Sequence, residues 1–342
     1  MRSPSTIYLV TRTHGMRTHL LSSENFKTMA KSRNISEIVD LLMRSDYASE
    51  IGKLPSDEVD SVRLEKIFLN TLTERFFILA RNAGGKARDF LDAYVKRIEV
   101  ENIKRVLRAK HAQEKIEEHH LIPLRREYTL INFPALTEAK NVEEMVSLLR
   151  ETVYAPLNER LDNYKRVELS IILESFLEGI YFGRVWKRIK GLDNRQGPKR
   201  LVGEESDLRN LQLMLSMKMR NIAPTLIEEM SIPTFYRLRK ERLTELARGR
   251  LEDAPGILAG TPYNKIMEDV LKTPNSAINL ETVLSRRIYQ NASFALRNLF
   301  LEFGYIVAYL LLCEREAKNL VTITTAIDLK FSEEDLKRRL FL

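Results

Sequence analysis

The sequence predicts an all-α protein made of three tandem helical-bundle repeats. Three observations lead to this prediction. Glycine and proline are scarce, with 13 and 11 in 342 residues, while helix-favouring Leu, Glu, Arg and Lys are abundant. Apolar residues recur three and four positions apart along most of the chain. Two short motifs also recur about every 108 residues, which is typical of internal repeats.

The helices expected in each repeat follow from the apolar spacing. In the first repeat, Ser36 is expected to cap the second helix and Gly84 with Gly85 to end the third. The second and third repeats carry long helical patterns over 167–189 and 281–323. The first repeat is expected to contain four helices, over residues 22–30, 35–43, 62–80 and 87–115.

The first recurring motif is an acid, an asparagine three residues later, and an aliphatic residue directly after it. The asparagines lie 108 and 109 residues apart. The motif falls at Glu99, Asn102 and Ile103; at Asp207, Asn210 and Leu211; and at Glu316, Asn319 and Leu320.

The second motif ends in a tyrosine and lies upstream of the first. LLMRSDY, LLRETVY and ILAGTPY share an aliphatic pair, a Ser or Thr, and Tyr47, Tyr154 or Tyr263. Each tyrosine precedes the next asparagine by 55, 56 and 56 residues. Because the spacing between the two motifs is nearly constant, we expect three repeats. They would cover residues 1–125 (with an N-terminal extension), 126–234 and 235–342, and proline-containing stretches would join them.

Asn102 lies in the middle of an apolar helical stripe and is therefore predicted to be buried. A buried amide costs about 1–3 kcal/mol unless it is hydrogen-bonded. We expect each motif asparagine to form a docking bond, either to a backbone carbonyl or to the acid one turn earlier. The alternative is that the acids and asparagines line a surface shared by the repeats. The tyrosines are expected to be buried anchors, with Ser45, Thr152 and Thr261 as caps.

Composition and charge narrow the class of protein. The net charge of +8 makes an acidic partner or an anionic surface nearby plausible. The single cysteine, Cys313, excludes an intrachain disulfide, favours a reducing compartment, and is expected to be buried. The apolar run over 304–313 is too short to cross a bilayer, and the first 15 residues show no secretory signal.

The sequence contains no catalytic, cofactor-binding or metal-binding motif that we recognise. Phosphate-loop, dinucleotide-binding and zinc-binding patterns are absent. His119 and His120 are neighbours on a helix and would point about 100° apart, which makes them poor joint metal ligands. The basic segment 237–250 is either a solvated helix face or a partner-docking patch, with Arg237, Arg239, Lys240 and Arg242 as its candidate contacts.

Taken together, the motifs resemble the C subunit of archaeal A-type (V-type) ATP synthases, a family that includes the d subunit of eukaryotic vacuolar ATPases. The resemblance runs from about Leu20 to Ile327 and is carried by the segments 17–51, 99–110, 260–271 and 314–323. The family commonly has a basic residue soon after the asparagine, as Lys104 here, where the later copies have Gln212 and Val321. Lys110 and Lys218 lie late in their helices, where the third copy has Ile327.

The resemblance implies a pseudo-threefold helical funnel, peripheral to the cytoplasmic face of the membrane. It would sit on the membrane ring of proteolipid subunits, hold the central stalk, and act indirectly on the catalytic head. Such a protein would be non-catalytic and need no cofactor. The alternatives are a helical repeat adaptor or scaffold in the cytosol and a basic repeat protein that binds nucleic acid. We expect no nucleic-acid partner, because basic and aromatic residues do not interleave along a repeated stripe.

Overall fold

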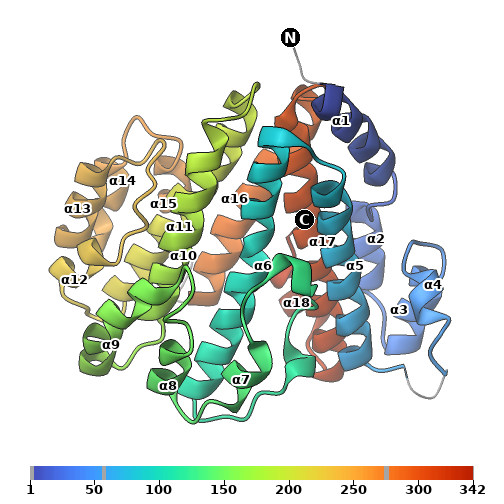
Figure 1. Ribbon diagram of the computed structural model, residues 1–342, viewed down its shortest axis with the longest axis horizontal. Helices are drawn as coiled ribbons and strands as arrows, with labels where there is room; N and C mark the ends of the chain where they lie inside the picture. The colour runs from blue at the N-terminus through green and yellow to red at the C-terminus, as the bar shows by residue number, and fades with distance from the viewer. Residues whose placement is uncertain (1–3, 56–58, 273–276, 342) are drawn as a thin grey trace. The chain divides into compact units, whose positions relative to one another are not determined.

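The computed structural model describes residues 4–55, 59–272 and 277–341 (Figure 1). Within these ranges the regular elements are α-helices and short 3₁₀ helices, with no strand, which confirms the all-α prediction. By contacts the chain divides into two compact units. The first unit combines residues 1–87, 193–201 and 275–342, and the second combines 88–192 and 202–274. This division differs from the three consecutive segments expected from the sequence, because it joins the two ends of the chain.

The first unit is built around α17, the helix that contains the apolar run. α17 packs against α5, α16 and α1, and its residues from Phe303 to Cys313 are all buried. The first unit holds α1 (Pro4–Arg17), α2 (Ser23–Met29), α3 (Ile35–Leu42), α4 (Ala48–Ile51), α5 (Ser61–Arg81), α16 (Ala277–Asn298), α17 (Phe303–Asp328) and α18 (Glu333–Arg339).

Two glycines allow a close helix approach in the first unit. Gly197, near the start of α11, and Gly304, near the start of α17, approach so closely that a Cβ on Gly304 would lie 2.9 Å from the Gly197 Cα. The same Cβ would lie 2.7 Å from Leu299 Cδ1. Only glycine fits at this crossing without displacing backbone.

The second unit contains most of two long helices, α6 from Arg88 onward and α11 from Val202 onward, together with α10 and many short helices. α12 packs on α13, α14 on α15, and α10 on α9 and on the 3₁₀ helix η4. Its helices are α6 (Gly85–His111), η2 (Glu118–His120), η3 (Arg126–Tyr128), α7 (Phe133–Glu138), α8 (Val142–Ser147), η4 (Ala155–Arg160), α9 (Leu161–Val167), α10 (Ile171–Ile189), α11 (Gln196–Lys218), α12 (Pro224–Glu229), α13 (Lys240–Arg248), η5 (Leu251–Asp253), α14 (Ala254–Ile257) and α15 (Asn264–Lys272).

Local signals set several helix ends. The cap of α3 is Asn34, whose side chain accepts from the Glu37 amide, so the expectation that Ser36 is the cap was wrong. The expected break at Gly84 and Gly85 is present, because α5 ends at Arg81 and α6 begins at Gly85 with a φ of 54°. Among the described residues no helix combines the length and the apolar character needed to span a membrane.

Candidate interaction sites

Each of the three motif acids is buried and accepts a hydrogen bond from one motif tyrosine. The sequence placed each tyrosine in the same repeat as the motif asparagine that follows it, but the hydrogen bonds of Tyr154 and Tyr263 join them to the motif acid that precedes them. No motif acid precedes Tyr47 in the chain, and its hydroxyl donates instead to Glu316, the motif acid of the third copy. The distances from the tyrosine Oη to the carboxylate oxygen are 2.8 Å for Tyr154 and Glu99, 2.7 Å for Tyr263 and Asp207, and 2.7 Å for Tyr47 and Glu316.

The turn before each tyrosine is the same in all three copies. The hydroxyls of Ser45, Thr152 and Thr261 donate to a leucine carbonyl three residues earlier, at 2.6–2.7 Å. Each hydroxyl also accepts from the amide of the tyrosine two residues later, at 3.1–3.3 Å. These side chains therefore close the turn that aims the tyrosine at its acid.

Each motif asparagine binds the backbone of one residue that lies just after the short helix following its own helix: η2 in the first copy, α12 in the second and α18 in the third. The side-chain amide donates to the carbonyl of that residue, and the side-chain oxygen accepts from its amide. We call this pair of bonds the asparagine clamp. The donated and accepted distances are 2.8 and 2.8 Å for Asn102 with Ile122, 3.1 and 2.8 Å for Asn210 with Ile232, and 3.2 and 2.9 Å for Asn319 with Phe341.

The clamp explains why an amide lies on an apolar stripe. Asn102, Asn210 and Asn319 are each at most 1% exposed, and two bonds compensate their burial. Of the two bonds considered from sequence, the partner is the backbone and not the acid one turn earlier. Because the amide both donates and accepts, it fixes the position of the loop along the helix as well as its distance.

Two of the motif acids, Asp207 and Glu316, also accept hydrogen bonds from backbone amides. Asp207 accepts from the amides of Tyr236, Arg237 and Leu238 at 3.0, 2.6 and 2.9 Å, so one carboxylate fixes the segment that leads into α13. Glu316 accepts from the Leu21 amide at 2.5 Å, just before α2.

In the third copy, sequence reasoning missed a buried arginine that pairs with the acid. Arg75 Nη1 lies 2.6 Å from Glu316 Oε1, and the two side chains are 7% and 1% exposed. A signal was present, because Arg75 interrupts the buried stripe of α5, three residues after Leu72 and four before Leu79. In the first copy Lys96 takes a related place, 2.9 Å from Glu99.

Burial and the neighbouring carboxylate together raise the pKa of all three tyrosines. Burial is the larger cause for Tyr47, Tyr154 and Tyr263, and each pKa lies well above the ordinary value. Burial also raises the pKa of Asp207 and outweighs the hydrogen bonds that lower it. The Cys313 thiol has a pKa raised to about 12 by burial. At neutral pH the tyrosines are therefore neutral donors and Cys313 is a thiol.

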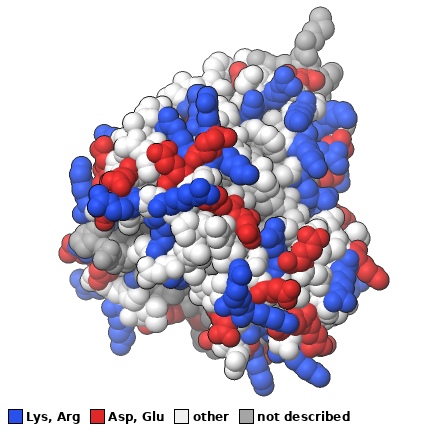
Figure 2. All heavy atoms as spheres, turned by 90° about the vertical axis from the view of Figure 1, so that its left-hand side faces the viewer, with Lys and Arg blue, Asp and Glu red and all other residues white. Residues whose placement is uncertain are grey.

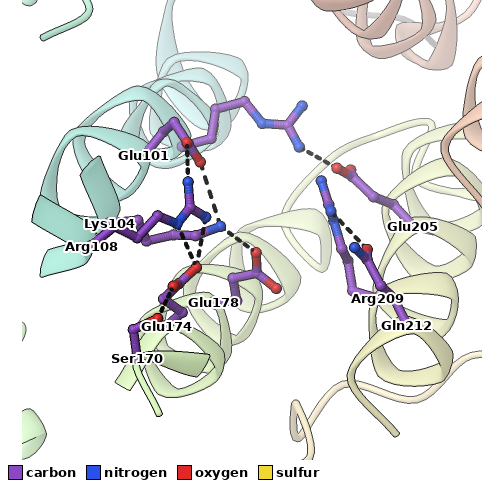
Figure 3. A network of polar contacts seen from close by, with 10 residues as sticks. Glu101, Lys104, Arg108, Ser170, Glu174, Glu178, Glu205, Arg209 and Gln212 are labelled. Carbon is purple, nitrogen blue, oxygen red and sulfur yellow. Dashed lines mark hydrogen bonds and ion pairs between the residues drawn. The ribbon is translucent and has the colours of Figure 1, made fainter. Parts of the chain in front are cut away.

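A network of charges in the second unit joins α6 to α10 and to α11 (Figure 3). From α6, Lys104 Nζ lies 2.8 Å from Glu178 Oε1 on α10, and Arg108 lies 2.6 Å from Glu174. Arg97, also on α6, lies 2.6 Å from Glu205 on α11. Opposed side chains of both signs thus bridge three long helices.

The charges of this network persist although the network is largely enclosed. Burial lowers the pKa of Lys104, but nearby carboxylates outweigh it and the net shift is upward. Burial raises the pKa of Glu178, but Lys104 and Arg209 outweigh it and the net shift is downward. Both groups are therefore ionised at neutral pH, and removal of one partner would leave a buried charge.

Lys110 and Lys218, the late-helix lysines of the first two copies, make different contacts from Ile327, the residue at the corresponding position of the third copy. Lys110 donates to the Thr137 carbonyl at 2.6 Å, and Lys218 to the Ala247 and Gly249 carbonyls at 2.9 and 2.6 Å. Both lysines hold the last turn of a short helix, where carbonyls lack helical partners. Ile327 instead packs against the apolar cluster of the first unit.

The candidate basic contacts of segment 237–250 have different surroundings. Arg242 donates to the Ile257 and Ala259 carbonyls and so holds the α14 turn. The Arg237 guanidinium lies 5.2 Å from the Tyr236 ring centre and is exposed, as are Arg239 and Lys240. Figure 2 views the side of the second unit that carries α12, α13 and α14 and shows basic and acidic residues interspersed there.

The described residues contain no group of three or more His, Cys, Asp or Glu side chains placed to hold a metal ion. The rings of His119 and His120 lie 3.9 Å apart between centroids, and His119 approaches Glu117 at 3.2 Å.

These contacts define a class of all-α protein. In it, a buried hydrogen bond between a tyrosine and an acid, and a buried asparagine clamp, each occur three times. Residues 9–339 match the family described as ATP synthase (C/AC39) subunit. The chain belongs to this family.

Relatives of this family in archaea resemble the chain over most of their length. The C subunit of the A-type ATP synthase of Methanocaldococcus jannaschii is 26% identical over 92% of this chain and 81% of that protein. The corresponding protein of Methanothermobacter thermautotrophicus is 28% identical over 86% and 79%, respectively. That of Methanosarcina mazei is 26% identical over 98% and 92%.

Proposed function

We propose that this chain is the non-catalytic central-stalk socket of a rotary A/V-type ATP synthase. It would couple the proteolipid ring of the membrane sector to the central stalk, during ion-driven ATP synthesis or ATP-driven ion pumping. The observation that carries the proposal is the family match over residues 9–339, together with archaeal A-type ATP synthase relatives that align over most of the chain. The socket would be peripheral to the membrane on its cytoplasmic face.

We further propose that the chain forms three lobes around a pseudo-threefold funnel, with the central stalk held in its cavity. Support comes from the three equivalent sets of clamp, acid and tyrosine bonds. The pairing of Tyr47 with Glu316 suggests that each lobe begins at an acid-bearing helix, and that the last lobe is completed by the N-terminal segment.

The buried bonds suit a part that transmits torque. A torque-bearing element must resist sliding of its short helices over its long ones. Each asparagine clamp opposes such sliding with two directional bonds, and the Lys104 and Arg97 ion pairs tie α6 to α10 and α11. Buried polar groups that are paired rigidify a fold, as the donor and the acceptor of each clamp asparagine are, which supports a mechanical role.

We propose Arg237, Arg239 and Lys240 as a partner-docking patch at the start of α13. Arg242 is left out of this patch because it holds two backbone carbonyls. The double variant R239E/K240E is expected to weaken assembly with the stalk or ring, measured by co-purification. Lys265→Glu, a charge reversal at an exposed position of α15, is the control. Equal recovery of both variants would show a solvated surface instead.

The proposal is tested by a tagged pull-down of the chain from gently solubilised native membranes, with mass spectrometry of the bound proteins. Recovery of proteolipid and central-stalk subunits is the expected result. Recovery of the chain alone in the soluble fraction would favour the cytosolic adaptor and overturn the socket.

A further inference from the structure

Three large apolar side chains of the first unit are exposed near the end of α16, one in the helix itself and two in the turn that leads to α17. Phe294, Phe300 and Leu301 are 47%, 54% and 52% exposed. Single exposed apolar residues are ordinary on soluble proteins, but three large ones within residues 294–301 indicate an interaction surface.

Basic side chains accompany these apolar ones. Arg297 is exposed on the last turn of α16, and Arg195 and Arg200 are exposed beside the start of α11. The Arg200 guanidinium lies 5.5 Å from the Phe294 ring centre. Asp193 and Glu302 are the acids nearest along the chain, so the net charge here is positive. We call Phe294, Phe300, Leu301, Arg195, Arg200 and Arg297 the α16–α17 corner.

The corner is held firmly, so its exposure does not reflect a loose turn. The close approach of Gly197 and Gly304 joins the starts of α11 and α17, and both glycines also lie close to the Leu299 side chain of the turn. On the other side, His14 of α1 contacts the Phe300 carbonyl at 2.6 Å and stacks on Tyr305 with ring centres 4.1 Å apart.

Helix α1 extends the same chemistry. Its Ile7 and Tyr8 are 54% and 49% exposed, and Arg12 donates to the Tyr8 hydroxyl at 3.0 Å. Arg17, at the end of α1, is exposed and lies 3.4 Å from the Tyr305 hydroxyl. α1, which contacts the corner through His14, thus also exposes aromatic, aliphatic and arginine side chains.

We propose that the α16–α17 corner binds the surface of a membrane that contains anionic lipid. Aromatic side chains favour the headgroup region, where an apolar ring and a polar edge are both accommodated. Arginines are attracted to lipid phosphates and to the negative surface potential of anionic membranes. The mixture of exposed rings and arginines favours a lipid surface over an acidic peptide, for which charge alone would suffice. This contact goes beyond the proposed socket role and does not require it, since it involves the free chain and lipid.

The test is co-sedimentation of the purified full chain with vesicles. One set contains phosphatidylcholine alone and the other contains phosphatidylcholine with phosphatidylglycerol. We expect binding to the anionic vesicles and little to the neutral ones. The double variant R195E/R297E should weaken binding at least about fivefold for each arginine. F300S/L301S should also weaken binding to the anionic vesicles. The loss should be larger at high salt, because salt screens the attraction of the arginines and binding then depends more on the apolar side chains.

Matched controls come from α3 of the same unit and the turns beside it. R33E/R44E reverses two exposed charges, and Met43→Ser removes an exposed apolar side chain. Both should bind anionic vesicles as the unmodified chain does, and circular dichroism should show the same helix content in every variant. Equal losses in corner and control variants would overturn the proposal. So would binding to polyglutamate without binding to anionic vesicles, which would indicate an acidic protein partner. Neither result bears on the pull-down that tests the socket.

Discussion

Replacing the clamp asparagines with leucine tests whether they hold the loops to the long helices. Leucine has nearly the same size but can neither donate nor accept. In Asn210→Leu the amide and carbonyl of Ile232 would both lose their side-chain partner. We expect the helices to persist and the loop before α13 to loosen.

The magnitude follows from the number and burial of the groups left unpaired. Each buried backbone group without a partner costs about 1–3 kcal/mol, so Asn102→Leu, which leaves the Ile122 amide and carbonyl without their partner, should cost about 2–5 kcal/mol. Asn210→Leu should cost about 1–3 kcal/mol, because the Ile232 carbonyl still accepts from the Thr234 amide at 2.8 Å and only the Ile232 amide is left unpaired. Ile122 and Ile232 are buried, whereas Phe341 is partly exposed, so water can replace part of the third clamp. Asn319→Leu should therefore cost less, about 1–2 kcal/mol. Asn70→Leu on the exposed face of α5 is the control, with an effect within about 0.5 kcal/mol.

The assay combines urea unfolding with hydrogen exchange. Urea midpoints followed by circular dichroism rank the variants, and exchange measured by mass spectrometry reports the peptides that contain Ile122, Ile232 and Phe341. Each variant should speed exchange in its own loop first. The reasoning is refuted if all three variants match Asn70→Leu, or if exchange in the clamped loops is unchanged.

Three further predictions concern other buried contacts. Arg75→Met should destabilise the first unit by about 3–5 kcal/mol, because Glu316 keeps a buried charge, and R75M/E316Q should recover part of the loss in thermal unfolding. Gly304→Ala should cost about 1–3 kcal/mol through its clash at the crossing, while Gly183→Ala, whose Cβ meets nothing within 4 Å, should be neutral or stabilising; an equal effect in urea unfolding would contradict the crossing. The buried tyrosines have raised pKa values, so stability that is complete below about pH 10 should fall as the pH rises above it, since the unfolded tyrosines then ionise. Titration followed by ultraviolet absorbance should show a group of tyrosines that ionise at higher pH than the rest, and Tyr154→Phe should make this group smaller. Ionisation of every tyrosine near the ordinary pKa would contradict this prediction.

The sequence was sufficient for the helical class because periodicity and scarce breakers are local signals. It also identified the buried asparagines, since an amide on an apolar stripe is visible in one helix. It could not identify Ile122 or Ile232 as partners, because a bond to backbone leaves no side-chain signature in the partner.

Long-range pairing was the other part that the sequence could not supply. Spacing alone placed Tyr47 with Asn102, whereas the hydrogen bond joins Tyr47 to Glu316, 269 residues away. A repeat has no intrinsic starting point in sequence, so its phase is decided by packing. The basic segment likewise gave four candidates of equal standing, and only the structure showed that Arg242 is engaged with carbonyls.

The central claim, that the chain couples the ring to the stalk, is tested most directly by ion pumping in reconstituted vesicles. Complexes prepared without this chain should hydrolyse ATP through their catalytic head but pump no ions, and adding the purified chain back should restore pumping. Pumping at the full rate without the chain would contradict the account.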